Sequence, residues 1–332
     1  MRIRAGLPRG VTALLFDEAR ARRALEARLS QELEKRGFDE ALLPVMDYFD
    51  PYSKLLLPQV QSELYRFVDR EGELLALRGD FTPMLARLLR PRLADLELPL
   101  RLFYRGDVVR YQETRPGRLR EDTQLGAELI GARGANDDET MIDLFLQLLT
   151  AEVQRIEDAT PDLEIVLGVA GALDRLLEAQ AHEHDVREVL RAVRARDREV
   201  TRSLDSTLLE IVEAGQPKDV ERLGPAAAED VGALLELAQR LEERYPQARV
   251  TVDLAEFADQ VLDDGLLRRG AGSGYYDGVV FRAFLRGNAQ PAGGGGRYDG
   301  LFGGAGSKVG AVGFFLGLDR ILEQKSAGGG AR

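Results

Sequence analysis

The sequence contains no cysteine, and this absence removes several kinds of chemistry at once. A chain without cysteine forms no disulfides, holds no metal through thiolates and has no cysteine nucleophile. Histidine is nearly absent as well: the 332 residues include only His182 and His184, which lie in one polar stretch. A His-x-His pair could ligate a metal, but no third ligand is indicated, so a solvated helix face is predicted. Neither a metal site nor histidine-based acid–base catalysis is therefore predicted.

Positive charge and long apolar runs are also scarce. The chain has 45 basic and 56 acidic residues and a formal net charge of −11, whereas general nucleic-acid binders need basic residues to neutralise phosphates. No nucleic-acid partner is predicted, although a local basic patch is compatible with this composition. The N-terminus lacks the apolar core of a signal peptide, and no apolar run approaches the roughly 18 residues of a membrane span. We expect a cytoplasmic protein without a membrane partner, and the lack of cysteine fits a reducing compartment.

The apolar patterns predict an α+β fold with a largely antiparallel sheet flanked by helices. Leucines at helical spacing predict a first helix, with Asp17 as its N-cap and Gly37 as its stop. Strand patterns recur on both sides of a charged helical block, so we expect one core over 1–322, a helical insertion at 172–246 and a flexible tail at 323–332. Strands are expected at 37–50, 63–69, 73–80, 101–113, 122–131, 163–171, 248–257, 277–285 and 309–317, and further helices at 80–93 and 139–156.

The strand expected at 122–131 carries one apolar and one partly polar face, because alternate residues of a strand point the same way. The apolar face is expected in the core and consists of Leu125, Ala127 and Leu129. The other face places Gln124 and Glu128 about 13 Å apart, with Gly126 between them. This arrangement predicts a slot over the sheet for a small zwitterion with an amino group. A solvent-facing strand surface would explain the same pattern.

Arginines follow the preceding strand. Arg110 has a planar guanidinium group that is always charged and suits a carboxylate or a phosphate. The next loop adds Arg115, Arg118 and Arg120. These side chains could gather an anion, or they could form a solvated basic loop.

Tyrosines and glycines mark two later segments. Tyr275 and Tyr276 begin a strand, so one ring is expected in the core and the other could wall a pocket. Eight glycines occur in the fifteen residues 292–306, which matches neither the dinucleotide-binding nor the P-loop fingerprint. We expect this stretch to form a loop that lets the backbone approach a ligand, or else a flexible hairpin.

Taken in order, these segments resemble the class II aminoacyl-tRNA synthetase core, and specifically its histidyl branch. The resemblance covers nearly all of the chain except 172–246, where the synthetases also carry an insertion, and it implies the class II synthetase-like fold. The matching segments are an N-terminal signature at 6–16, motif 1 with Pro44 at 37–49, the Arg-Pro-Glu-Gly-Thr segment at 75–87, motif 2 at 108–131, the first histidine motif at 275–281, the second at 293–301 and motif 3 at 312–320.

Several departures distinguish the chain from the enzymes of that family. Ala271 matches an arginine that assists adenylate formation, Gln112 matches the motif 2 glutamate, and Asp319-Arg320 replaces a Glu-Arg pair. The chain ends shortly after motif 3, so no anticodon-binding domain is expected. The segments Arg-Gly-Asp-Phe-Thr-Pro at 78–83 and Tyr-Tyr-Asp-Gly-Val-Val-Phe-Arg at 275–282 are closer to another branch of the family. Together with the departures above, they resemble the regulatory subunits of ATP phosphoribosyltransferase, which are not themselves enzymes.

That resemblance implies a non-catalytic regulatory subunit, without cofactor, in the first step of histidine biosynthesis. Its implied partners are a short-form catalytic subunit in a hetero-octamer and a second copy of the chain bound through the motif 1 region. L-Histidine is the implied effector, through feedback inhibition. The implied histidine site consists of Asp80, Thr82, Arg110, Arg118, Gln124, Glu128, Tyr275 and Tyr276.

Within this implied site, Glu128, Gln124 and Asp80 would receive the α-amino group, and Arg110 or Arg118 the carboxylate. Tyr275 and Tyr276 would line the imidazole side. Two other interpretations remain open. Arg110 and Arg320 also suit a histidine-activating, adenylate-forming ligase, and Asp80 in place of the synthetase glutamate suits a scaffold that dimerises without sensing a ligand.

Overall fold

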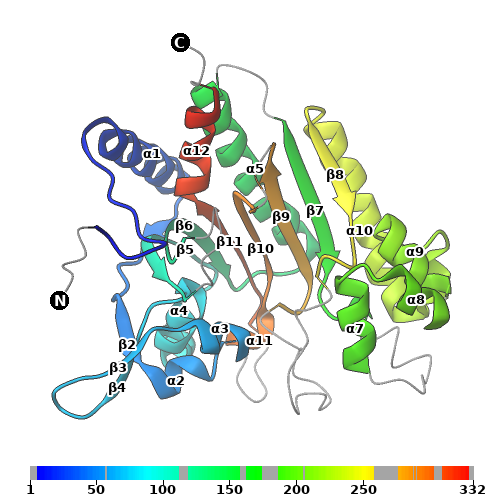
Figure 1. Ribbon diagram of the computed structural model, residues 1–332, viewed down its shortest axis with the longest axis horizontal. Helices are drawn as coiled ribbons and strands as arrows, with labels where there is room; N and C mark the ends of the chain where they lie inside the picture. Colours follow the sequence, from blue (N-terminus) through cyan, green and yellow to red (C-terminus); the bar gives the residue numbers. More distant parts are fainter. Residues whose placement is uncertain are drawn as a thin grey trace.

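An eight-stranded mixed sheet forms the centre of the structure, a computed structural model, in the order β1-β5-β6-β11-β10-β9-β7-β8 (Figure 1). Neighbouring strands are antiparallel except in the outer pairs β1–β5 and β7–β8. The predicted α+β class with a largely antiparallel sheet is therefore confirmed. The strands are β1 Asp39–Glu40, β5 Leu100–Val109, β6 Glu121–Ile130, β7 Leu163–Val169, β8 Ala248–Val252, β9 Val279–Leu285, β10 Gly293–Arg297 and β11 Ala311–Gly317. The structure describes residues 6–56, 58–111, 119–157, 162–173, 186–204, 206–257, 276–286, 288, 290–302 and 309–328.

Four helices pack on one face of this sheet and enclose the main core: α1 Phe16–Lys35, α5 Ala135–Glu157, α10 Pro225–Arg244 and α12 Leu318–Gly328. The first helix is confirmed: Leu25, Leu29 and Leu33 are buried, and Gly37 has a left-handed φ of 76°. Its predicted N-cap is wrong, because α1 is preceded by Leu15 and Asp17 lies in the first turn. An acidic side chain there still interacts favourably with the helix dipole.

The glycine-rich stretch is the main error in the expected fold. Residues 293–297 are neither a loop nor a flexible hairpin but β10, a central strand paired with β9 and β11. A Cβ added at Gly294 would lie 2.6 Å from the carbonyl oxygen of Phe281. The neighbouring strands approach so closely that side chains do not fit at the four glycines, and four consecutive glycines give no alternating pattern.

A smaller antiparallel sheet, in the order β2-β4-β3, lies beside the main one (Figure 1). Its strands are β2 Met46–Tyr48, β3 Arg66–Val68 and β4 Leu74–Leu77, and the β3–β4 hairpin is as predicted. The single strand expected over 37–50 is instead divided into β1 and β2, which belong to different sheets. Helices α2 Phe49–Ser53, α3 Pro58–Glu63 and α4 Phe81–Leu89, with the 3-10 helix η1 Arg90–Asp95, complete this part of the chain.

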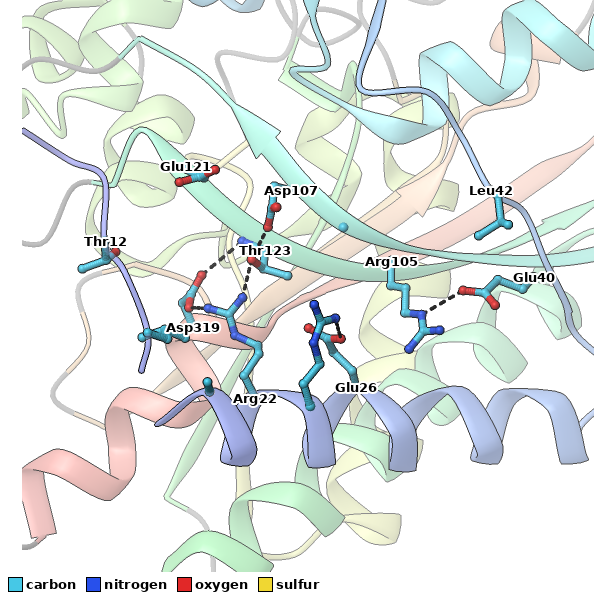
Figure 2. A pocket seen from close by; sticks show the side chains of 14 residues that line it. Thr12, Arg22, Glu26, Glu40, Leu42, Arg105, Asp107, Glu121, Thr123 and Asp319 are labelled. Carbon is cyan, nitrogen blue, oxygen red and sulfur yellow. Dashed lines mark hydrogen bonds and ion pairs between the residues drawn. The ribbon is translucent and has the colours of Figure 1, made fainter. Parts of the chain in front are cut away.

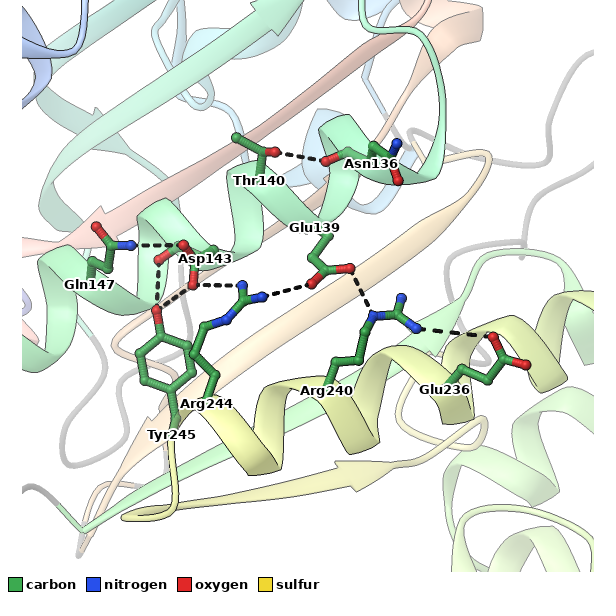
Figure 3. A network of polar contacts seen from close by, with 9 residues as sticks. All are labelled: Asn136, Glu139, Thr140, Asp143, Gln147, Glu236, Arg240, Arg244 and Tyr245. Atoms are coloured by element: carbon green, nitrogen blue, oxygen red, sulfur yellow. Dashed lines mark hydrogen bonds and ion pairs between the residues drawn. The ribbon is translucent and has the colours of Figure 1, made fainter.

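The helical block, which was predicted at 172–246, has its own apolar cluster. Its last helix, α10, also packs against the main core. Its elements before α10 are α7 Val186–Arg194, α8 Arg198–Leu204, α9 Ser206–Ala214 and the 3-10 helix η2 Val220–Leu223. The last helix, α10, also contacts α5 through an ion network (Figure 3). There Arg240 contacts Glu139 at 3.0 Å, and Arg244 and the Tyr245 hydroxyl contact Asp143 at 3.1 and 2.6 Å. His182 and His184 lie outside the described residues.

Within the described ranges, no helix combines the length and apolar character needed to cross a bilayer.

Candidate functional site

A cavity of about 640 Å³ lies on the face of the main sheet that α5 does not cover. The alternation of β6 creates it, because Leu125, Ala127 and Leu129 point into the main core while Gln124 and Glu128 line the cavity. The predicted division of β6 into two faces is confirmed. A cavity of this size is typical of small-molecule sites.

The space directly above Gly126 is filled, so the predicted slot does not open at this glycine. Tyr104 of β5 is paired with Gly126, and a Cβ at Gly126 would overlap the Tyr104 ring. The glycine therefore makes room for a tyrosine, not for a ligand. The Tyr104 ring stacks on Phe81 with centroids 4.2 Å apart, and the Arg78 guanidinium lies 3.9 Å from the Phe81 ring centroid. This column holds Tyr104 as one rigid wall of the cavity.

Glu128 lies at the closed end of the cavity, with none of its surface exposed. The Thr82 hydroxyl donates to one carboxylate oxygen at 2.5 Å, and the Tyr298 hydroxyl donates to the other. Gly313 of β11 faces this carboxylate, and a Cβ there would overlap it. Burial raises the pKa of Glu128 to about 7, although its hydroxyl donors oppose the rise. A buried carboxyl group that titrates near neutrality is typical of a functional site.

Asp80 occupies the mouth of the cavity and begins α4. Its carboxylate accepts a hydrogen bond from the Thr82 backbone N–H at 3.1 Å, as the N-cap of that helix. The buried Tyr52 hydroxyl accepts from the Asp80 N–H and donates to its carbonyl, both at 2.7 Å. Arg110 donates to the carbonyl of Gly79 at 2.6 Å and lies 3.3 Å from the Asp80 carboxylate. Burial raises the pKa of Asp80, and the charge of Arg110 opposes that rise.

Two tyrosines form another wall. The rings of Tyr276 and Tyr298 meet edge to face, with centroids 6.3 Å apart, and burial raises the pKa of Tyr276. Asp277 fixes their relative positions: its carboxylate accepts from the backbone N–H groups of Asp299 and Gly300. Those two residues begin the short helix α11 Asp299–Phe302, directly after Tyr298.

The structure brings most of the predicted site residues to this one cavity. Two others, Arg118 and Tyr275, lie outside the described residues. Those that line the cavity are Asp80, Thr82, Arg110, Gln124, Glu128 and Tyr276. Sequence reasoning missed Tyr104 and Tyr298. The signal for Tyr298 was its place in the second histidine motif, whereas the role of Tyr104 depends on strand register.

Comparison with known proteins assigns the chain to a family. A family model of histidyl-tRNA synthetase matches residues 10–321. The ATP phosphoribosyltransferase regulatory subunit of Symbiobacterium thermophilum is 36% identical over 98% of this chain and 82% of its own length. The chain belongs to the histidyl-tRNA synthetase family and resembles its regulatory-subunit members.

The family also includes close relatives with a different name. The histidine–tRNA ligase of Pyrobaculum neutrophilum is 32% identical over 95% of this chain and 75% of its own length. Among solved structures, a histidine–tRNA ligase subunit from Alicyclobacillus acidocaldarius matches with a TM-score of 0.74 and 27% identity, covering 98% of this chain and 99% of that one. The family's fold is therefore shared by chains named for both roles.

A second cavity, of about 480 Å³, lies on the other face of the sheet, beside α1 (Figure 2). Arg22 of α1 donates there to Asp319 and Thr123, and Thr123 donates to Asp107. Asp319 also accepts from the Thr123 backbone N–H at 3.1 Å. Asp319 thus joins α1 and α12 to β6 and faces away from the cavity that Glu128 lines.

In the part of the chain that the structure describes, no group of three or more acidic or histidine side chains is arranged to hold a metal ion.

Proposed function

We propose that this member of the histidyl-tRNA synthetase family is a regulatory subunit of ATP phosphoribosyltransferase that binds free histidine and does no chemistry itself. The single observation that supports this most directly is the closed end of the cavity. There, a fully buried Glu128 is held by Thr82 and Tyr298 and has a pKa raised to about 7. A polar acceptor enclosed by aromatic rings suits an imidazole N–H group, and the relatives' names supply the regulatory role.

Burial indicates how histidine would lie. Its imidazole ring would enter first and donate a hydrogen bond to Glu128, against the wall that Tyr276 and Tyr298 form. The charged ammonium group would remain near Asp80 and Gln124, because an ion is costly to move away from water unless it is paired. The Asp80 side chain is 28% exposed and Glu128 is fully buried. This proposal differs from the orientation implied by the resemblance, in which Glu128 receives the amino group.

The regulatory role implies a partner that carries the catalytic activity. We infer that this partner is the short-form catalytic subunit, that the complex is a hetero-octamer, and that histidine inhibits it by feedback. Reciprocal coupling of this kind is typically about 1–3 kcal/mol between two sites. Histidine would then bind the inhibited arrangement of the complex more tightly than the active one.

An exposed apolar surface supports self-association through the motif 1 region. It lies on the small sheet and on the connection that leads to it from β1. Large apolar side chains are rarely gathered on a free surface unless they meet a partner. The exposed members are Leu42, Val45, Met46, Tyr48 and Phe67, with exposed fractions from 39% for Phe67 to 84% for Leu42.

Reconstitution tests this function. The short-form catalytic subunit should be nearly inactive alone, active when this chain is added, and inhibited when L-histidine is then added. A Glu128→Gln chain should still activate the catalytic subunit, but the histidine concentration needed for inhibition should rise about 10- to 100-fold, since a charge-assisted hydrogen bond is lost. If this chain activates the catalytic subunit but histidine has no effect, the chain acts as a scaffold that does not sense histidine. If it does not activate the catalytic subunit, the regulatory role is refuted.

A second candidate function is a histidine-activating ligase. Relatives named histidine–tRNA ligase, such as the one from Pyrobaculum neutrophilum at 32% identity, favour it. Histidine-dependent exchange of pyrophosphate into ATP would identify such an activity. The regulatory proposal predicts no exchange above the background of a Glu128→Gln control.

A further inference from the structure

Arg282 lines the same cavity, but neither the motifs nor the family resemblance gives it a role. It lies on β9 with its side chain on the cavity face, and its guanidinium contacts the Glu256 carboxylate at 2.5 Å. The same guanidinium lies 5.0 Å from the centroid of the Phe257 ring. Gly294 of β10 is paired with Arg282, and a Cβ at that glycine would lie 3.3 Å from the arginine side chain. The glycine strand therefore leaves room for Arg282 to extend over the sheet.

The strand register places Arg282 in a row of residues that crosses the floor of the cavity. One cross-strand row runs over β6, β11, β10 and β9 through Gly126, Phe315, Gly294 and Arg282. On β6 this row lies midway between Glu128 and Gln124, and Arg282 begins three strand spacings away, about 14 Å. In the structure the Arg282 guanidinium contacts Glu256 and Phe257, so it would turn toward β6 only when it leaves Glu256. A ligand that extends from Glu128 toward Gln124 thus lies alongside the Arg282 row.

Arg110 is less well placed for the same task. Its guanidinium turns back to the Gly79 carbonyl and the Asp80 carboxylate. These contacts orient Asp80, the proposed partner of the ammonium group.

Glu256 connects Arg282 to the helical block. The backbone N–H groups of Ala255 and Glu256 donate to the Asp253 carboxylate at 3.0 and 3.2 Å, and Arg196 of the helical block pairs with Asp253. Ala255 is buried in the apolar cluster of that block. The Arg282–Glu256 ion pair, which lines the cavity, therefore links the central sheet to the helical block.

We propose that Arg282 binds the carboxylate of the amino-acid ligand, and that this carboxylate displaces Glu256 from the guanidinium. The planar fork of arginine suits a bidentate carboxylate. Both Arg282 and Glu256 are partly exposed, at 30% and 34% of their side chains, so exchange of one carboxylate for another requires no isolated buried charge. The released Glu256 segment would transmit occupancy of the cavity to the helical block. This inference rests on the proposed histidine-binding function.

The test compares L-histidine with L-histidinol, which has a hydroxymethyl group in place of the carboxylate, by calorimetry on the full chain. Wild type should prefer histidine. Arg282→Gln should weaken histidine binding about 10- to 100-fold, the effect expected for a lost charge-assisted bond, and leave histidinol binding within about threefold. Glu256→Gln should change histidine binding in the opposite direction, making it several-fold tighter, because it removes the competing carboxylate.

Controls separate the possible failures. Glu128→Gln should weaken both ligands equally, since both carry the imidazole ring. Wild type that binds neither ligand would refute the proposed function itself. Loss of the preference for histidine in Arg110→Gln, with the preference intact in Arg282→Gln, would overturn the assignment of Arg282. If Arg282→Gln fails to fold, Glu256→Gln still decides the matter, because unchanged or weaker histidine binding by that variant contradicts the exchange.

Discussion

Replacement of Glu128 by glutamine probes the closed end of the cavity before any ligand is added. Glutamine has nearly the shape of the protonated glutamic acid, and it keeps an oxygen that can accept from the Thr82 hydroxyl. It differs from Glu128 in that it never ionises. The substitution therefore isolates the effect of a single titration on the free energy of unfolding.

The magnitude follows from the pKa of Glu128, which rises from an ordinary value of 4.5 to about 7 in the folded protein. Between these two values the folded state holds a proton that the unfolded state releases, so the free energy of unfolding falls as the pH rises. The stabilising contribution is complete below pH 4.5 and is lost once the pH has passed through about 7. A shift of this size corresponds to about 3 kcal/mol in total, of which about 2 kcal/mol is lost between pH 5.5 and 8.5.

Urea unfolding of wild type and Glu128→Gln over that pH range measures the effect. Groups such as Asp80 titrate in both proteins, so most of their contribution cancels in the difference. The wild type should lose about 2 kcal/mol relative to the variant as the pH rises from 5.5 to 8.5. Parallel stability curves would show that Glu128 does not titrate in this range and would refute the account of its burial.

Three further predictions concern other parts of the structure. Tyr298→Phe removes a hydrogen bond that holds the pKa of Glu128 down, so the pH dependence of the free energy of unfolding should extend to higher pH, as measured by the same urea series. Gly126→Ala places a Cβ inside the Tyr104 ring, and such overpacking should lower the free energy of unfolding by about 1–3 kcal/mol, whereas stability equal to wild type would contradict the wall that Tyr104 forms. Phe67→Asp puts a charge on the exposed apolar surface and should convert a dimer to a monomer in light scattering, while an unchanged mass would place the self-association surface elsewhere.

The sequence predicted the polar face of β6 because side-chain alternation is local. Leu125 and Leu129 showed which face was core, and Gln124 and Glu128 then had to lie on the other face. The first helix was predictable for the same reason, since the spacing of its leucines reports one buried stripe. These signals need no knowledge of which segments meet.

The register between strands was not predictable in this way. Whether the space above Gly126 is open depends on the residue opposite it on β5, and only the pairing with Tyr104 shows that it is filled. Strand β10 was missed because its first four residues are glycines, which show no alternation of apolar and polar side chains. Arg282 was missed for the same reason: its place in the cavity follows from pairing with Gly294.

A crystal structure of the chain grown with L-histidine would test the central claim most directly. We expect one histidine in the cavity over β6, with an imidazole nitrogen within hydrogen-bonding distance of the Glu128 carboxylate and the ammonium group near Asp80. Histidine bound with its ring toward solvent, or found only outside this cavity, would contradict the proposed site.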